Sequence, residues 1–350
     1  LDGNGGWIFM MADGNNWMGA CDMGAGPDFL PGRVPLADET GRQNLENAWK
    51  SKISPDPGLG MTELVAAAEN GTLKALYIMG ENPLRRLPQP DRVARALKKL
   101  DFIVVQDIVQ NQSTALAEVI LPGAAFTEKT GAFTNMEGRI QNFFPLAAPP
   151  GKARPDWEIL SLLISKMGYP ERYETLEQVK QEIRRLVPMY ADLGSQQQGW
   201  IQNNPAAGGS RMKFASAGLP ELPKLPDGFP WTAILGQQRF HAGCGTRTSR
   251  SGRIQAFDSV GQVEIAADDA TLMGVAEKDV IRVTSPYGHI ERCCRVNPEM
   301  PAGQVFIPLA AHGNDAASLL DLSAPPASDM PGWEACRVKI EKIETKGEMP

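Results

Sequence analysis

The first residues that could do chemistry are Gly80, Glu81 and Asn82, in the segment GENP. They follow directly after the strand expected at Lys74–Met79. Backbone N–H groups and an amide at the carboxyl edge of a sheet can hold a phosphate or a polar ring. An ordinary tight turn would use the same residue types, so this segment alone leaves both interpretations open.

A carboxylate stands at the end of the next expected strand, where Asp107 follows Gln106 in the segment FIVVQD. A carboxylate in this place can accept two hydrogen bonds from the N1–H and the exocyclic amine of guanine. The alternative role for Asp107 is to cap the segment that follows it. The residues by themselves favour neither role.

The strongest candidate for binding an anion is a loop in the second half of the chain, HAGCGTRTSRS at His241–Ser251. Arginine forks give bidentate contacts to phosphate, and glycine lets the backbone approach a ligand closely. A flexible basic loop is the alternative. His312, Asn314 and Asp315 follow the strand expected at Gln304–Pro308 and could line the same cleft.

Other catalytic and metal-binding patterns are absent from the sequence. None of the five cysteines forms a C-x-x-C pair, and the three histidines have no metal-ligand spacing. The chain has no P-loop and no G-x-S-x-G motif. From the residues alone we therefore predict binding of a nucleotide-like polyanion, with no catalytic residue and no metal ligand.

The bulk properties describe a globular chain of 350 residues with 42% apolar and 22% charged residues. A net charge of −6 argues against a nucleic-acid partner, and no apolar run is long enough to span a bilayer. The chain opens at Leu1 without a methionine, so we expect a fragment of a longer polypeptide.

Strand and helix patterns alternate through the first half of the chain. We expect a parallel sheet covered on both faces, because Phe102–Val105 is almost continuously apolar and the spacing suits strand–helix–strand crossovers. Asp13–Gly32 reads as an extended loop, and Asp156 reads as the cap of a helix to Lys166. The predicted helices and the other strands are Glu63–Asn70, Asp91–Leu100, Thr114–Ala117, Val119–Leu121 and a capping-box helix from Thr175 to about Val187.

The second half has a β pattern. A proline-rich connector at Leu219–Pro230 separates it from the first half. Regular short strands with turn signals between them predict a small barrel. The expected strands are Gln262–Ile265, Asp279–Thr284, His289–Val296, Gln304–Pro308 and Ala335–Ile343.

In order and spacing these motifs resemble the C-terminal half of the molybdopterin oxidoreductase (dimethyl sulfoxide reductase) family. The nearest branches are the formate dehydrogenase alpha subunits and the G subunit of NADH–quinone oxidoreductase (complex I). The resemblance is carried by NNWMGACDMGAGPDFLPG, ALYIMGENP, LKKLDFIVVQD, STALAEVILP, EKTGAFTNMEGRIQ, ARPDWEIL, GQVEIAADDATLMGVAEKDVIRVTSPYG and PAGQVFIPLAAHGN.

The resemblance implies an α/β fold, with a parallel-sheet Rossmann-like domain followed by a small, double-psi-like β-barrel domain. It implies domains at 1–170, incomplete at its N-terminus, and 231–350, joined by a helix and connector at 171–230. It also implies the cofactor molybdopterin guanine dinucleotide in the intact protein. The residues it would place on this cofactor are Gly80, Glu81, Asn82, Gln106, Asp107, Asp156, His241, Thr246, Arg247, Thr248, Ser249, Arg250, His312 and Asn314.

By the same resemblance the chain is part of a molybdenum-dependent oxidoreductase subunit that passes electrons to iron–sulfur clusters. The iron–sulfur motif and the metal ligand are expected only in the N-terminal half, so no catalytic residue is assigned. The expected partners are that half and the electron-transfer subunits of a cytoplasmic complex, which associates with the membrane without inserting into it. The alternative is a structural subunit of a respiratory complex that keeps the fold and binds no molybdenum cofactor.

Two positions depart from the family pattern, since Glu118 and Ala132 stand where Asp and Thr are common. In the branch comparison, WMGACDMG favours the formate dehydrogenase pattern. NMEGRIQ is closer to the complex I pattern, because Gly138 stands where formate dehydrogenases often have a second Arg.

Overall fold

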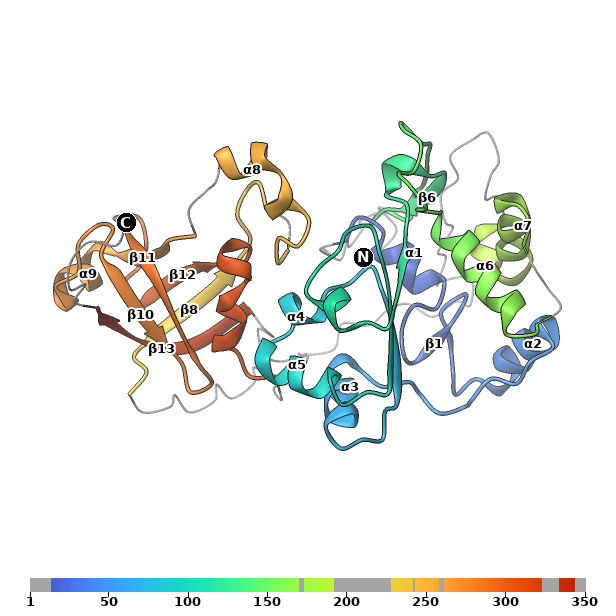
Figure 1. The fold of residues 1–350 in the computed structure, drawn as a ribbon, viewed down its shortest axis with the longest axis horizontal. Helices are drawn as coiled ribbons and strands as arrows, with labels where there is room; N and C mark the ends of the chain where they lie inside the picture. Colours follow the sequence, from blue (N-terminus) through green and yellow to red (C-terminus); the bar gives the residue numbers. More distant parts are fainter. Residues whose placement is uncertain are drawn as a thin grey trace, which may run out of the picture. The chain divides into compact units, whose positions relative to one another are not determined.

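The computed structural model describes residues 14–169, 173–191, 228–241, 243–257, 261–322 and 334–343. The chain divides into two compact units (Figure 1). Unit 1 comprises Leu1–Gly60 and Leu121–Ser216, and unit 2 comprises Met61–Ile120 and Ala217–Pro350. This division differs from the domain limits expected at 1–170, 171–230 and 231–350, which stay a prediction. Most of the proline-rich connector lies outside the described residues.

Unit 2 begins with an α/β layer around a three-stranded sheet of order β3-β4-β5. Strands β3 and β4 pair in parallel, with Ala75 opposite Phe102 and Met79 opposite Gln106. The predicted parallel sheet is therefore confirmed. The elements of the layer are α3 (Met61–Glu69), β3 (Ala75–Met79), α4 (Pro83–Arg86), α5 (Pro90–Leu97), β4 (Phe102–Asp107), the 3₁₀ turn η1 (Ser113–Leu116) and β5 (Val119–Pro122).

One face of this sheet is covered and the other is open. Ile78, Ile103 and Val105 point to the covered face, where they pack with apolar side chains of α3 and α5. The opposite face exposes apolar side chains, among them Tyr77 and Met79. Alternation along each strand produces this division. In the described part of the chain the sheet is thus covered on one face only, whereas the apolar run of β4 predicted cover on both.

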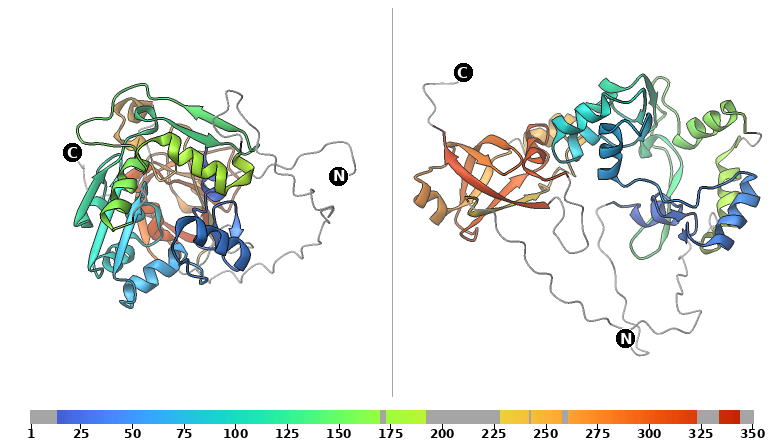
Figure 2. Two further views of the ribbon diagram at one scale, coloured as in Figure 1. Left: turned by 90° about the vertical axis from the view of Figure 1, so that its right-hand side faces the viewer. Right: turned by 90° about the horizontal axis from the view of Figure 1, so that it is seen from below.

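The second part of unit 2 is a closed barrel of order β10-β11-β9-β12-β8-β13 (Figure 2). It mixes parallel pairs, β11 with β9 and β12 with β8, with antiparallel ones. The predicted barrel is confirmed, although the pattern missed its first strand, β8. The strands are β8 (Trp231–Gly236), β9 (Val263–Ala266), β10 (Val280–Thr284), β11 (His289–Asn297), β12 (Gln304–Pro308) and β13 (Ala335–Lys342).

Short helical elements connect the barrel strands. The remaining elements of this part are η5 (Thr248–Arg250), α8 (Gly252–Phe257), α9 (Ala267–Met273), η6 (Ala311–Gly313) and η7 (Asp315–Leu319). Inward-facing residues of the strands alternate with outward-facing ones, and their side chains fill the barrel with an apolar core. Ile281 and Val283 of β10 are fully buried there.

The barrel and the α/β layer pack on each other within unit 2. Leu322, which follows the barrel strands, is buried in the apolar core of the α/β layer. The backbone N–H of Gln89 donates to the carbonyl of Ala317 over 3.0 Å. These contacts fix the barrel loops relative to the ends of β3 and β4.

Unit 1 is built from helices and two short hairpins. Its buried cluster centres on Ile140, Val187 and Tyr190. Strands β6 and β7 form an antiparallel hairpin, with Gly131 opposite Phe143. The elements are α1 (Trp17–Asp22), β1 (Phe29–Leu30), β2 (Val34–Pro35), α2 (Glu39–Trp49), η2 (Phe126–Glu128), β6 (Gly131–Thr134), β7 (Ile140–Phe143), α6 (Asp156–Lys166), α7 (Leu176–Leu186) and η3 (Pro188–Tyr190).

Three local expectations for unit 1 have clear outcomes. The segment expected as an extended loop at Asp13–Gly32 contains helix α1, because Asp22 is held in a buried position by polar partners. Asp156 is the first residue of α6 and not its cap, which is Pro155. The capping box is confirmed, since Thr175 accepts from the N–H of Gln178 at the start of α7.

Among the described residues, no helix is both long and apolar enough to cross a membrane.

The barrel core gives a direct test of the packing. Replacing Ile281, which is fully buried in β10, with alanine should lower the free energy of unfolding by about 2–5 kcal/mol, because the substitution leaves a cavity. Ile234→Ala in β8 of the same barrel is the matched control, since this side chain is 41% exposed. Urea denaturation of both variants measures the difference, and equal losses would contradict the barrel packing.

Candidate functional site

The predicted strand-end residues lie together at the carboxyl edge of the sheet. Gly80 adopts a left-handed conformation with φ of 66°, which lets the chain turn directly after β3. Its N–H donates to the carbonyl of Gln106 over 2.8 Å, so the ends of β3 and β4 stay paired. The Gln106 side chain is 1% exposed and accepts a hydrogen bond from the hydroxyl of Tyr77.

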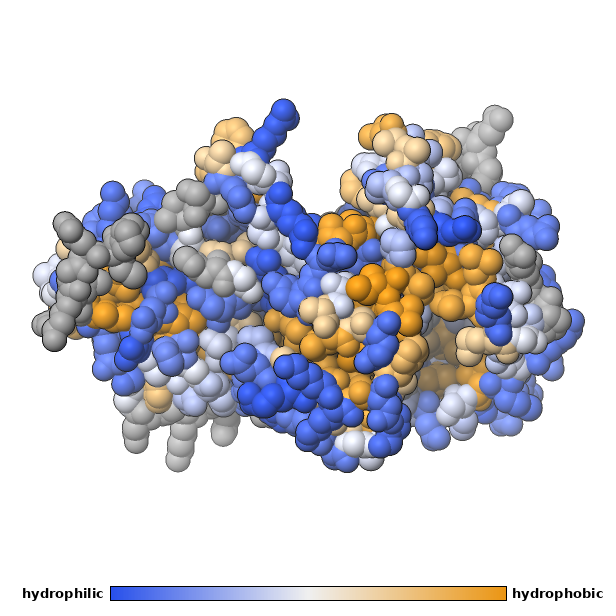
Figure 3. All heavy atoms as spheres, viewed as in Figure 1, coloured by the Kyte–Doolittle hydropathy of each residue, from blue (hydrophilic) through white to orange (hydrophobic). Residues whose placement is uncertain are grey.

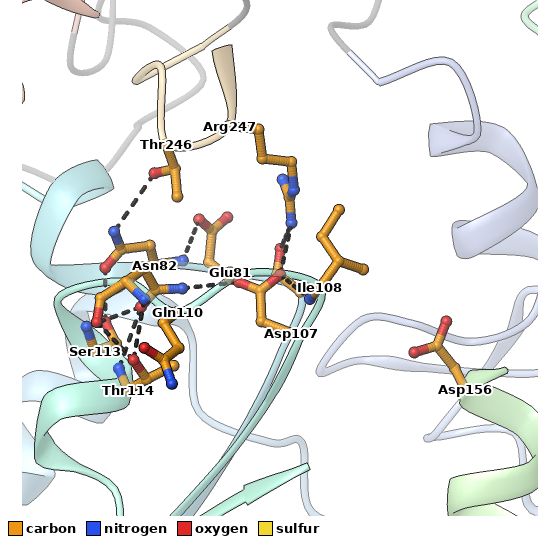
Figure 4. A network of polar contacts seen from close by, with 12 residues as sticks. Glu81, Asn82, Asp107, Ile108, Gln110, Ser113, Thr114, Asp156, Thr246 and Arg247 are labelled. Carbon is orange, nitrogen blue, oxygen red and sulfur yellow. Dashed lines mark hydrogen bonds and ion pairs between the residues drawn. The ribbon is translucent and has the colours of Figure 1, made fainter. Parts of the chain in front are cut away.

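Asn82 is the centre of a buried hydrogen-bond network (Figure 4). Its side chain is buried, and Oδ1 accepts from the hydroxyl of Ser113 over 2.7 Å. Its Nδ2 donates to Oε1 of Gln112 over 2.8 Å and to Oγ1 of Thr246 over 3.4 Å. Asn82 therefore joins the turn after β3 to η1 and to the barrel loop. Its backbone N–H is satisfied by Oε1 of Glu81.

Asp107 carries both a local and a long-range set of partners. Oδ1 accepts from the N–H of Ile108 over 2.7 Å, and Oδ2 accepts from Nδ2 of Asn111 over 2.8 Å. Arg247 reaches from the barrel loop to Oδ1 over 3.2 Å and also donates to the carbonyl of Gly80 over 3.0 Å (Figure 4). The Asp107 side chain is only 2% exposed, whereas that of Arg247 is 49% exposed. Asp107 therefore holds the segment after β4, as the capping role predicted, and also pairs with a cation, whereas the guanine role stays a prediction.

The loop at 241–251 is ordered by contacts of its own polar side chains. Nδ1 of His241 lies 2.9 Å from Oγ1 of Thr248, and the ring is buried. Ser249 donates from its hydroxyl to the carbonyl of Gly245 over 2.6 Å. Arg250 donates to the carbonyl of Gln110, in the segment after β4. These contacts set the shape of the loop and direct Arg247 and Arg250 toward the sheet edge, and anion binding by the loop stays a prediction.

Asn314 is the most unusual residue of the barrel side. It adopts a left-handed conformation with φ of 65° between η6 and η7, and it is 3% exposed. Its Nδ2 donates to the carbonyl of Arg85, but its Oδ1 has no hydrogen-bond partner in the described part of the chain. A buried acceptor without a donor costs free energy, so this oxygen favours a ligand that brings an N–H or O–H group.

A cavity of about 520 Å³, open to solvent, lies beside the strand ends. Its lining is mostly amide and hydroxyl groups together with the guanidinium of Arg250. The residues are Gln110, Asn111, Gln112, Thr114, Ala115, Ile120 and Arg250. This volume is within the usual range for small-molecule and cofactor sites.

Most of the predicted site residues come together in unit 2. The strand-end set, Gly80 to Asn82 with Gln106 and Asp107, contacts the barrel loop through Thr246, Arg247 and Arg250. Asp156 belongs to unit 1, where it pairs with Lys129, and the side chain of His312 lies outside the described part.

Sequence reasoning missed several participants, namely Arg85 and the amide-rich segment Gln110–Gln112 with Ser113. The segment VQNQST gave a signal, since consecutive amides and hydroxyls after a buried strand are unusual on a plain surface. Arg85 gave none, because LRRLP looks like an exposed basic turn. Its burial depends on the barrel.

A second buried network lies in unit 1 and connects two of the recognised motifs. Asp22 of GACDMG is completely buried and accepts from the hydroxyl of Tyr190 over 2.8 Å and from Arg33. The Tyr190 hydroxyl also lies 2.7 Å from Oγ1 of Thr134 in GAFTN. Burial is the main cause that raises the pKa of Tyr190 far above its ordinary value. This network stabilises unit 1.

Two family models match most of the chain. One, described as molybdopterin oxidoreductase, matches residues 8–166, and the other, described as a molydopterin dinucleotide binding domain, matches residues 232–337. The chain belongs to the molybdopterin oxidoreductase family. The barrel of unit 2 is accordingly the molybdopterin dinucleotide-binding domain of this family member.

Several curated relatives support the assignment. The alpha subunit of the F420-dependent formate dehydrogenase 1 of Methanococcus maripaludis is 33% identical over 94% of this chain. The alpha subunit of the NADPH-Fe(3+) oxidoreductase of Geobacter sulfurreducens is 31% identical over 91% of this chain, and Escherichia coli formate dehydrogenase H is 28% identical over 94%. The chain spans 52%, 36% and 49% of these relatives' lengths.

A solved structure shows the same fold. Acetylene hydratase from Pelobacter acetylenicus superposes with a TM-score of 0.61 at 15% sequence identity. The match covers 87% of this chain and 50% of the acetylene hydratase chain. At this level of identity the comparison supports the arrangement of the sheet and the barrel and nothing about chemistry.

The residues present fit a molybdopterin dinucleotide. The buried orphan oxygen of Asn314 suits a ring N–H donor, and Arg247 and Arg250 suit a diphosphate. Within the described residues, no group of three or more His, Cys, Asp or Glu side chains could hold a metal ion.

The buried network around Asn82 can be tested with a double-mutant cycle. Asn82→Ala should lower the free energy of unfolding by about 1–3 kcal/mol, because it strands the donor of Ser113 in a buried place. Ser113→Ala added to Asn82→Ala should cost less than Ser113→Ala alone, with a coupling of about 0.5–3 kcal/mol. Ser251→Ala is the control, and its effect should add to that of Asn82→Ala. Additive effects of the Asn82 and Ser113 substitutions would contradict the network.

Proposed function

We propose that this chain is the dinucleotide-binding portion of a formate dehydrogenase-like oxidoreductase subunit and holds molybdopterin guanine dinucleotide in the intact polypeptide. One observation carries the proposal: two loops of the dinucleotide-binding barrel meet the carboxyl ends of β3 and β4 in a single polar network. When bound, the cofactor supplies a metal that takes electrons from a small substrate for transfer to iron–sulfur clusters. We expect those clusters in the N-terminal half of the full-length polypeptide.

Asp107 and Arg247 bind different parts of the dinucleotide, namely the guanine edge and the diphosphate. Ile108, Asn111 and Arg247 occupy three of the roughly four lone-pair positions of the Asp107 carboxylate. A guanine edge brings two donors, so it requires Arg247 to leave Oδ1. The released guanidinium is then free for the neighbouring diphosphate, which is the anion it fits best.

Asn314 provides the contact from the barrel side. Its Oδ1, which has no hydrogen-bond partner among the described residues, would accept an N–H of the pterin ring system. His241 and Thr248 hold the adjacent loop in shape through their mutual hydrogen bond. These residues bind and orient, and none of them moves a proton in the reaction.

A second function is a structural subunit of a respiratory complex, related to the G subunit of NADH–quinone oxidoreductase, that keeps this fold without molybdenum. The observation in its favour is that Arg247 and other protein groups already satisfy most of the Asp107 carboxylate. A fold whose own side chains satisfy the hydrogen-bonding groups of the site does not require the cofactor for stability.

The open face of the sheet supports a further partner. Tyr77, Met79 and Phe102 lie on this face and are each 38–46% exposed, and apolar side chains gather over this part of unit 2 (Figure 3). Contiguous apolar surface of this kind marks an interface in a soluble protein. We propose that the remaining part of the full-length polypeptide covers this face. Electron-transfer subunits and a cytoplasmic location also stay predictions.

The two functions are separated by metal analysis of the full-length protein. Purified full-length protein should contain molybdenum or tungsten in near-stoichiometric amount, together with pterin fluorescence after oxidative release of the cofactor. Absence of both metal and pterin from well-folded protein would rule out the catalytic function and leave the structural one.

Asp107→Ala should weaken retention of the cofactor by about 1–3 kcal/mol, because the guanine edge loses its charged acceptor. We expect the metal content per folded full-length protein to fall about tenfold after dialysis. Asp101→Asn, an exposed carboxylate change just before β4, is the matched control and should keep full metal content. Normal metal content in the Asp107→Ala protein would refute the role of this residue.

Met79→Lys should disturb the proposed interface and leave the fold of the chain intact. Met79 is 46% exposed, so the free energy of unfolding of the 350-residue chain should change by no more than about 0.5 kcal/mol. Association with the separately produced remainder of the polypeptide should weaken at least tenfold in a pull-down titration. Leu272→Lys, at an 81% exposed position of α9, is the control and should associate normally. Undiminished association of the Met79→Lys chain would contradict the interface.

A further inference from the structure

Arg85 is a buried cation in the short helix α4, directly after the turn that carries Gly80 and Asn82. The residue is 8% exposed, whereas its neighbour Arg86 has a side chain that is 52% exposed. Among the described residues, no carboxylate forms an ion pair with the Arg85 guanidinium. A buried charge without a counter-ion is expensive, so its hydrogen bonds must be good ones.

All three nitrogens of the guanidinium donate, and each reaches a barrel segment. Nε donates to the carbonyl of Cys244 over 2.7 Å, and one terminal nitrogen donates to Oγ of Ser249 over 3.1 Å. The other terminal nitrogen donates to the carbonyl of Ala310 over 2.9 Å. One side chain therefore binds two separate loops, at 244–249 and at 310–314.

The backbone of the same residue adds a fourth contact. The Arg85 carbonyl accepts a hydrogen bond from Nδ2 of Asn314. The Oδ1 of the same amide, which has no partner among the described residues, therefore points away from Arg85. The two loops also touch each other closely, since a Cβ added to Gly245 would lie 2.7 Å from Cβ of Ala310. Arg85 thus sits where all three segments of the candidate site converge.

We propose that Arg85 is a positioning residue of the dinucleotide site, whose guanidinium holds the 244–250 and 310–314 loops against the end of β3. In this proposal Arg85 contacts the two loops that carry the candidate cofactor-binding residues, and it does not contact the cofactor itself. The planar fork is what allows one side chain to satisfy three acceptors in two loops, and a lysine ammonium has no such fixed geometry. The loop geometry stands on its own, and its consequence for the cofactor rests on the proposed function.

Burial also affects the pKa and the electric field of the Arg85 guanidinium. Burial is the main cause that lowers the pKa of Arg85, the neighbouring Cys244 opposes this effect, and the charge of Arg250 reinforces it. The guanidinium remains charged, because its ordinary pKa is far above neutrality. Its field therefore adds to that of Arg247 and Arg250 and favours an anion at this edge.

The first experiment uses the 350-residue chain without any nucleotide. Arg85→Gln should speed amide hydrogen exchange at least tenfold in peptides covering 243–251 and 310–319, while β10 and β11 peptides exchange as in the wild type. Arg85→Lys should behave like Arg85→Gln, because it restores the charge and not the fork. Arg86→Gln, the same charge change one residue along the helix, should leave both loops unchanged.

The second experiment follows the cofactor in the full-length protein. Arg85→Gln and Arg85→Lys should both lose cofactor at least tenfold faster on dilution than the Arg86→Gln protein, measured per folded molecule. If Arg85→Gln does not fold, Ser249→Ala removes one of the three acceptors and should give a smaller acceleration of exchange in both loops. Wild-type exchange in the Arg85→Lys or Ser249→Ala chain would overturn the proposal. Because exchange is measured without cofactor, a full-length protein devoid of cofactor would refute the proposed function and not the positioning by Arg85.

Discussion

The structure of unit 2 depends on one constraint, which is that polar groups buried between the α/β layer and the barrel must find partners. Asn82 and Arg85 meet this constraint on the sheet side, and Thr246, the Cys244 carbonyl and Asn314 meet it on the barrel side. An apolar interface would tolerate sliding, whereas hydrogen bonds with fixed directions specify one arrangement. The two parts are therefore locked in a single geometry, and the loops that carry Arg247 and Arg250 are set at the strand ends.

This arrangement explains why an acidic chain can hold an anionic ligand. The net charge of −6 is distributed over the whole sequence, but Arg85, Arg247 and Arg250 lie together with Asp107 at one sheet edge. The charge at this sheet edge is positive, and the charge near a site affects ligand binding more than the net charge of the whole chain does. The negative net charge disfavours a nucleic-acid partner over the surface as a whole. It does not exclude a phosphate site at a locally basic edge.

Much of the fold could be predicted from the sequence, because local patterns determine it. The parallel strands, the barrel and the capping box at Thr175 follow from residue periodicity and turn chemistry. Helix α1 was not predictable in this way, since its residues look like a loop and Asp22 is buried by Tyr190 and Arg33 from distant positions. The roles of Arg85 and Gln112 were hidden for the same reason, because their partners are supplied by segments far away in the chain.

The candidate site combines groups that are satisfied with one that is not. Asn82 and Asp107 have protein partners in hydrogen-bond distance, and they are positioned before any ligand arrives. Asn314 differs, because it combines a left-handed backbone with a buried acceptor that finds no donor in the described part of the chain, and both features cost free energy. A purely structural subunit gains nothing from keeping such a residue at the centre of its interface. A cofactor-binding one does, since a ring N–H placed against Oδ1 turns the cost into binding energy. The unsatisfied oxygen of Asn314 is therefore the feature of this chain that most favours the cofactor over the structural alternative.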